Sequence, residues 1–245
     1  MSKRETYRAI LRDMPDWDAY LLRESGLPGP RGNLELAQAV ADEGDLLRFE
    51  RYLPNTPDTA PVNSPYEFLA FCGAVGLGRL LAEGDDTLLV VLRRCASDPR
   101  WRMREGVAMA LQRLGDADMP RLVAAARDWA RGTPFEQRAA AAALCEPRLL
   151  GAPAHARATL QILNAITASI PRVTDRRSDD FRALRQGLGY CWSVAVAALP
   201  AEGKPLMENW LASPDPDVRW IMRENLKKAR LERVTPEWVK QMRDR

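Results

Sequence analysis

Two octets in this chain carry residue types from which a binding or catalytic site could be built. DPRWRMRE occupies residues 98–105 and DVRWIMRE occupies residues 217–224, and six of the eight letters agree. Each octet supplies a tryptophan, arginines and a glutamate within two helical turns. An arginine guanidinium suits bidentate contact with phosphate. The repeated phrase therefore indicates either a surface for an anionic partner or a structural unit that the fold uses twice.

The C-terminal octet continues into a basic stripe. On one helix over residues 215–232, Arg219, Arg223, Lys227 and Arg230 would share a face, because residues about four apart lie on the same side. Such a face, beside an apolar one, resembles a surface that binds phosphates. In the first octet two arginines share a face likewise. The predicted nucleic-acid-binding residues are Arg100, Arg104, Arg185, Arg219, Lys227 and Arg230.

The same residues also have a purely structural interpretation. Asp98 could pair with Arg104, and Asp215 or Asp217 could pair with Arg223, as a hydrogen-bond ladder between neighbouring helical units. The two tryptophans of the octets could simply pack against the preceding unit. Exposure of the tryptophans and the partners of the arginines distinguish the two interpretations.

Charge is unevenly distributed along the sequence. The net charge is only +3, but residues 1–90 carry 9 basic and 15 acidic side chains, whereas residues 219–245 carry 9 and 4. Such asymmetry can mark an anionic partner. Arginine outnumbers lysine 31 to 5, which suits phosphate contact but which a GC-rich genome would also produce.

The composition argues against several kinds of catalysis. His155 is the only histidine, so a Ser-His-Asp or Cys-His mechanism is not expected. The four cysteines are scattered without a CxxC pair, and each lies in or beside an apolar run. This pattern predicts small buried side chains rather than disulfides or zinc ligands. We expect no metal and no cofactor.

The sequence shows no targeting or membrane-spanning pattern. The N-terminal residues are charged throughout, and the longest uncharged apolar stretches are too short to cross a bilayer. We therefore expect a soluble, cytoplasmic monomer with no membrane partner.

Helical periodicity dominates the chain. Apolar residues recur at i, i+3, i+4 and i+7 in segments of 10–20 residues, separated by brief Gly, Pro and Asp breaks. Arginines at positions 104, 138, 185 and 223 can be aligned as anchors of four related segments, about 40 residues apart. That period fits a unit of two helices and their turns.

The segment DPRWRMREGVAMALQRLG resembles the second helix of a HEAT repeat: an Asp-Pro turn, an apolar-Arg pair, then small and apolar residues. The resemblance implies an all-α solenoid, a right-handed superhelix of antiparallel helix pairs, forming a single domain over residues 1–245. Residues 85–245 would hold the repeats, and residues 1–84 would form a divergent N-terminal cap.

A second resemblance concerns function. RWIMREN is similar to a Trp-x-x-Arg-Glu phrase in the C-terminal repeat of bacterial alkylpurine DNA glycosylases of the AlkD type, HEAT-like proteins of similar length that grip duplex DNA. An upstream tryptophan with a carboxylate four residues later, and an intervening arginine, are further features of that family. The resemblance implies a catalytic set of Trp101, Glu105, Arg138, Trp220 and Arg223. Aromatic faces would meet a cationic alkylated base, and the carboxylate would stabilise charge at the sugar or position water.

This chain departs from the family in two ways. The carboxylate is Glu rather than Asp, and the interval from Arg138 to Trp220 holds about one extra repeat. Three functions consequently stay open. They are duplex DNA binding without chemistry, DNA alkylation repair by base excision, and a non-enzymatic protein-interaction scaffold whose concave face takes an acidic partner.

Overall fold

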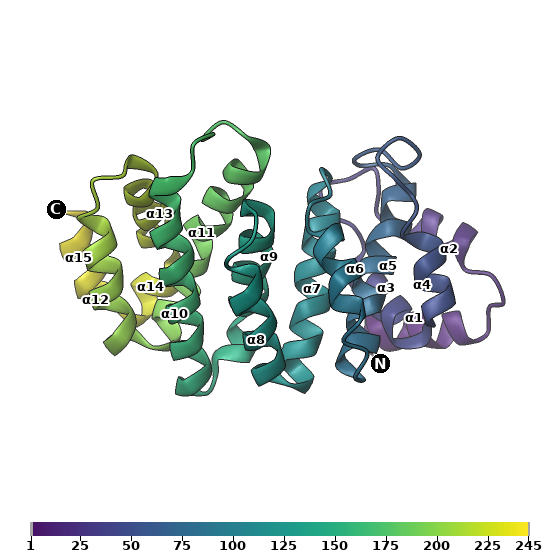
Figure 1. Ribbon diagram of the computed structural model, residues 1–245. Coiled ribbons are helices and arrows are strands. Elements are labelled where there is room, and N and C mark those ends of the chain that lie inside the picture. Colours follow the sequence, from purple (N-terminus) through teal and green to yellow (C-terminus); the bar gives the residue numbers. More distant parts are fainter. Residues whose placement is uncertain (1, 245) are drawn as a thin grey trace. The chain divides into compact units, whose positions relative to one another are not determined.

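The computed structural model describes residues 2–244, and all of the regular secondary structure in this range is helical. Figure 1 shows coiled ribbons joined by short connections, which confirms the predicted all-α class. The chain divides into two compact units, Met1–Ala117 and Asp118–Arg245, called unit 1 and unit 2 below. Among the described helices, none combines the length and apolar character needed to cross a membrane.

The described residues of unit 1, 2–117, form seven α-helices. They are α1 (Lys3–Arg12), α2 (Asp18–Glu24), α3 (Leu34–Glu43), α4 (Leu46–Tyr52), α5 (Pro65–Ala82), α6 (Leu88–Cys95) and α7 (Trp101–Ala117). Helices α1, α3, α5 and α7 pack side by side in that order, and α2, α4 and α6 pack on α5.

Helix α5 forms the centre of unit 1. Ser64 caps its first turn by accepting a hydrogen bond from the backbone N–H of Glu67, and Pro65 occupies the position where a helix tolerates proline best. Most of the residues from Phe68 to Leu81 are buried, because apolar and small side chains follow one another on every face. The glycine at position 78 lets α7 approach closely, as its backbone faces Ala110.

In unit 2, the part of the chain that the structure describes (118–244) forms eight α-helices and two short 3-10 helices. They are α8 (Met119–Trp129), α9 (Pro134–Leu144), η1 (Pro147–Leu150), α10 (Pro153–Ser169), η2 (Ile170–Arg172), α11 (Asp179–Ala198), α12 (Pro200–Leu211), α13 (Pro216–Leu226), α14 (Ala229–Val234) and α15 (Pro236–Arg243).

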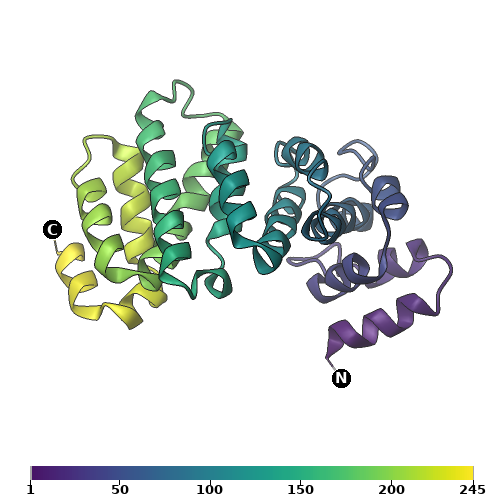
Figure 2. The same ribbon diagram turned by 60° about the horizontal axis from the view of Figure 1, so that its bottom comes forward.

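The helices of unit 2 form two layers. Helices α9, α11 and α13 pack side by side, and α8, α10 and α12 form a second row against them (Figures 1 and 2). Trp192 of α11 is fully buried and joins the layers, since its indole Nε1–H donates to Thr167 Oγ1 of α10 at 3.1 Å. Alternate helices of the chain therefore belong to the same layer.

One sequence prediction about unit 2 is wrong. The stretch 215–232 is not a single helix, because α13 ends at Leu226 and α14 begins at Ala229. The physical reason lies in the apolar residues on either side of the break. Leu226 and Leu231 are both buried, whereas a continuous helix would separate two residues five apart by about 140°. The break therefore brings both leucines into the core, and it removes Arg230 from the predicted stripe.

The two octets also occupy different places in their helices. Helix α7 begins at Trp101 itself, whereas α13 begins at Pro216, four residues before Trp220. In unit 1, Arg104 Nη1 donates to the carbonyls of Asp98 at 2.7 Å and Pro99 at 2.8 Å. In unit 2, the arginine that makes the same contacts is Arg219, which donates to the carbonyls of residues 213 and 214, both at 2.8 Å. Arg104 thus corresponds in geometry to Arg219, and the letter alignment is one helical turn out of register.

A carboxylate cluster on α3 ties three helices of unit 1 together. Asp42 accepts from Arg4 of α1 at 2.7 Å and from Arg113 of α7 at 3.0 Å, while Glu43 accepts from Arg12 at 2.7 Å and from Arg8 at 2.6 Å. Burial raises the pKa of Asp42, but the hydrogen bonds and charges of its arginines outweigh burial and hold that pKa below its usual value. The hydrogen bond from Arg12 is the main reason that the pKa of Glu43 is also lowered.

This cluster predicts loss of stability in acid. Both carboxyl groups have lower pKa values in the folded protein than in the unfolded chain, so the unfolded chain binds more protons as pH falls. Their contribution is present above about pH 4 and is lost as the pH drops further. Urea unfolding at pH 6 and pH 3 should show a smaller acid loss in an Asp42→Asn, Glu43→Gln double variant than in the unmodified protein. An equal loss in both proteins would show that the cluster does not contribute.

Candidate nucleic-acid interface

The structure brings Trp101 and Glu105 together at one pocket of unit 1. They lie one turn apart at the start of α7, and the pocket has a volume of about 230 Å³. Trp101 is 46% exposed, although it is one of the largest apolar side chains in the chain. The lining residues of this Trp101 pocket are Pro30, Arg31, Gly32, Leu34, Phe71, Trp101, Arg102 and Glu105.

Arg102 fixes the wall of the Trp101 pocket from inside the protein. Its guanidinium carbon lies 4.4 Å from the centroid of the Trp101 ring. Arg102 is only 5% exposed and donates to Glu67 Oε2 at 3.0 Å and to the Gly29 carbonyl at 2.7 Å. The indole is therefore held from beneath by a buried ion pair while nearly half of its surface stays accessible.

The Trp101 pocket combines three kinds of surface. Pro30, Leu34 and Phe71 supply apolar area, and Glu105 supplies a carboxylate. Arg31 is exposed at the rim, and within residues 2–244 its side chain has no ion pair or hydrogen bond. A flat, cationic or amine-bearing ring with a nearby anionic group matches this combination. Sequence reasoning missed Arg31, because nothing in the octets points to a loop about 70 residues upstream.

Trp220 in unit 2 has different surroundings. The guanidinium carbon of Arg185 lies 3.6 Å from its ring centroid, and Arg185 Nε lies 2.7 Å from Asp217 Oδ1. The edge of the indole faces Gly189 of α11. Trp220 is therefore only partly exposed, and a protein guanidinium covers a face of its ring.

The remaining two residues of the predicted catalytic set lie elsewhere in unit 2. The aliphatic part of Arg138, on α9, lies beside Gly187 of α11. Arg223 is exposed and lines a separate hollow of about 200 Å³ that also contains Glu208 of α12 and Met242 of α15. Within unit 2, Trp220 and Arg223 thus contact different neighbours rather than one shared pocket.

The six residues predicted to bind nucleic acid all have protein partners. Arg100 is 2% exposed and donates to Asp98 and to the carbonyls of Asn55 and Ala60, so it belongs to the interior of unit 1. Arg104 and Arg219 bind backbone carbonyls and Arg185 lies on Trp220, as described above. Lys227 pairs with Glu224, and Arg230 lies over the Tyr190 ring at 4.7 Å. The predicted hydrogen bonds between aspartates and arginines also differ in their partners. Asp215 pairs with Arg176 at 2.7 Å rather than with Arg223.

Three further arginines of unit 2 lie together at positions outside the two octets. Within the described part of the chain, Arg127, Arg131 and Arg172 make no ion pair, and they line one groove between α8 and α10.

None of the described histidine, cysteine, aspartate and glutamate side chains gather in threes that could hold a metal ion. No protein-family model, no curated protein and no solved structure matches this chain.

Proposed function

We propose that this chain is a HEAT-like helical-repeat protein that binds duplex DNA and holds one nucleobase in the Trp101 pocket. The alternate-layer packing of helices within unit 2, and the side-by-side row of α1, α3, α5 and α7 in unit 1, support the HEAT-like assignment. The observation that carries the functional proposal is the grouping of an exposed indole, a carboxylate and an unpaired arginine around one small apolar pocket.

Each part of the pocket matches one part of a nucleotide. The indole offers a stacking face for a base, and stacking on an aromatic side chain compensates for removing that base from the helix. The Glu105 carboxylate attracts a base that carries positive charge, as an alkylated purine does. Arg31, at the rim, is placed to contact a backbone phosphate next to the extruded nucleotide.

Base excision is the chemistry we propose for this pocket. The bond between C1′ of the deoxyribose and the base nitrogen breaks, and its electron pair leaves with the base, which converts a cationic alkylated purine into a neutral one. Water then bonds to C1′ and gives up a proton, for which Glu105 is the acceptor. The carboxylate also stabilises the positive charge that develops on the sugar.

The test compares intact duplex DNA with the same duplex carrying 7-methylguanine, using fluorescence anisotropy at several salt concentrations. We expect Trp101→Ala to weaken binding of the methylated duplex about tenfold, because stacking contributes about 1–3 kcal/mol per base. Arg31→Ala should reduce the slope of log K against log salt by about 0.9, the effect of one lost phosphate contact. Tyr66→Ala is the matched control, since Tyr66 is another exposed aromatic of unit 1, at 51%.

Glu105→Gln separates binding from catalysis. The variant should bind the methylated duplex within about twofold of the unmodified protein and should release base at least about a hundredfold more slowly, the usual effect of losing a general base. If the unmodified protein binds the methylated duplex but releases no base, the glycosylase activity is contradicted and only the DNA-binding function is supported. The absence of any salt-dependent DNA binding would overturn the whole proposal in favour of a protein-interaction scaffold.

A further inference from the structure

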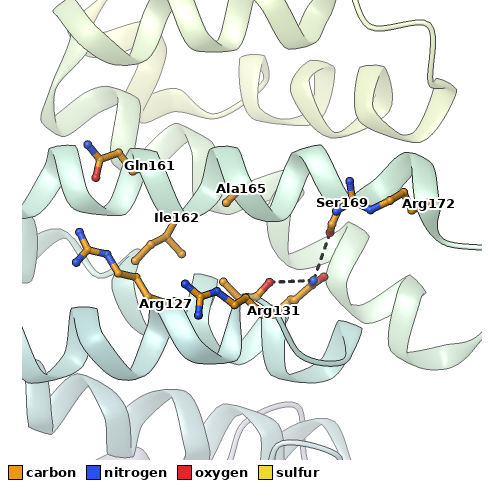
Figure 3. Close-up of a pocket in the computed structure, with 9 residues that line it drawn as sticks. Arg127, Arg131, Gln161, Ile162, Ala165, Ser169 and Arg172 are labelled. Carbon is orange, nitrogen blue, oxygen red and sulfur yellow. Dashed lines mark hydrogen bonds between the residues drawn. The ribbon is translucent and has the colours of Figure 1, made fainter.

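A basic groove in unit 2 lies outside the site discussed so far. It runs between α8 and α10, with Arg127 on α8, Arg131 in the turn that follows α8, and Arg172 just beyond the end of α10 (Figure 3). Its volume is about 460 Å³. The lining residues of this α8–α10 groove are Arg127, Ala130, Arg131, Gln137, Gln161, Ile162, Ala165, Ser169 and Arg172.

The α8–α10 groove has an uncompensated positive charge. Its lining contains three arginines and no carboxylate, and within residues 2–244 none of the three arginines forms an ion pair. Arg127 lies in the last turn of α8 and Arg131 in the turn that follows, and both line the groove, where they can reach the same anion. Both helices end near the groove, and each C-terminus offsets roughly half a charge, so helix ends alone balance about one of the three positive charges. About two charges are left for a ligand.

Gln137 of α9 organises the floor of the groove. It is 6% exposed, and its Nε2 donates to the Ala130 carbonyl at 3.1 Å and to Ser169 Oγ at 3.3 Å, the two bonds drawn in Figure 3. Only the nitrogen of the amide can donate to a carbonyl, so the orientation of the amide is fixed. The other atom, Oε1, is a buried acceptor without a hydrogen-bond partner. Such an atom destabilises the protein unless a donor reaches it.

We propose that the α8–α10 groove binds the phosphate of a phosphomonoester. A phosphomonoester carries up to two negative charges, which match the two uncompensated positive charges, and Arg127 and Arg131 can each make paired hydrogen bonds to its oxygens. The singly protonated form has one negative charge and brings a P–OH donor in place of the second charge, and a small movement of the Gln137 amide would place that donor against Oε1. A phosphodiester has one charge and no such donor. The inference does not depend on the nucleobase pocket of unit 1.

Isothermal titration calorimetry of the full chain at pH 6.5 tests the groove, with inorganic phosphate as the first probe and sulfate as a doubly charged anion of similar size that has no donor. We expect saturable phosphate binding that is weakened at least about tenfold in Arg131→Ala and in Arg127→Ala, and sulfate binding at least about tenfold weaker than phosphate. Arg177→Ala is the matched control, because Arg177 is an exposed arginine of unit 2 outside the groove. Thermal unfolding of each variant checks that it is folded.

Two results would overturn the proposal. Phosphate binding that is unchanged in the Arg127→Ala, Arg131→Ala double variant would place the anion elsewhere, and sulfate binding equal to phosphate would remove the phosphomonoester assignment. The source of the phosphate is resolved by two further probes, ribose 5-phosphate and a short oligonucleotide with and without a 5′-phosphate. Preference for the sugar phosphate identifies a small metabolite, whereas dependence on the 5′-phosphate identifies a nucleic-acid end. Failure of this test leaves the Trp101 pocket untouched, since its variants and probes are different.

Discussion

Replacing Arg102 by leucine is expected to lower the free energy of unfolding of the protein by about 3–5 kcal/mol, the usual cost of removing one partner from a buried ion pair. Glu67, its partner, is 0% exposed, and Glu67 Oε1 already lacks a hydrogen-bond partner. Without Arg102, the carboxylate would keep a single hydrogen bond, which it accepts from the backbone N–H of Asn63 at 2.7 Å. A fully buried carboxylate in that position would then have no counter-charge.

Urea unfolding followed by circular dichroism gives the free energy and the slope m, which should not change if only stability is affected. Adding Glu67→Gln to Arg102→Leu should recover at least about 1 kcal/mol, since the second substitution removes the unpaired charge. Arg94→Leu, at an exposed arginine of α6, is the control and should change stability by no more than about 0.5 kcal/mol. A similar loss for Arg94 and Arg102 would contradict the ion-pair explanation.

Gly78→Ala is expected to destabilise the protein by about 1–3 kcal/mol through overpacking. A Cβ at this position would lie 2.4 Å from the Ala110 Cα and 2.7 Å from the Ala110 carbonyl oxygen. These are backbone atoms, so α5 and α7 would have to move apart. The gain of up to about 1 kcal/mol that alanine brings to a helix interior is smaller than this cost.

Gly187→Ala provides the matched comparison, because Gly187 is also inside a helix. A Cβ there would meet only the Arg138 Cγ, at 3.2 Å, and a flexible arginine side chain can move away. We expect Gly187→Ala to be neutral or slightly stabilising in the same urea experiment. Equal effects of the two substitutions would show that the contact between α5 and α7 does not limit the size of residue 78.

The sequence predicted the helical class because its apolar periodicity is strong and local. The spacing of Trp101 and Glu105 likewise placed both at one site, since residues four apart in a helix share a face. The break after Leu226 could not be predicted in the same way. No glycine or proline marks it, and its cause is the burial of Leu231, which depends on helices far away in the sequence.

The partners of the arginines were the hardest feature to predict. A sequence pattern shows charges within about one turn, whereas Arg100 binds carbonyls at positions 55 and 60, and Arg102 binds Glu67. These contacts join segments that only the packed fold brings together. The same effect explains why the side chains of Arg31, Arg127 and Arg131 have no ion pair within residues 2–244, because the packed fold brings no carboxylate to them.

The correspondence of Arg104 with Arg219 has an evolutionary consequence. What the two helices share is an arginine that folds back onto the carbonyls at the start of its own helix, five and six residues upstream. Positions 104 and 219 should therefore retain arginine together among descendants of this chain, while Arg223 should vary independently of Arg104. If the helices arose by duplication, the matching letters of the two octets lie one turn away from the ancestral register. The agreement of these letters would then result from convergence, because both segments are amphipathic helices that use similar residues.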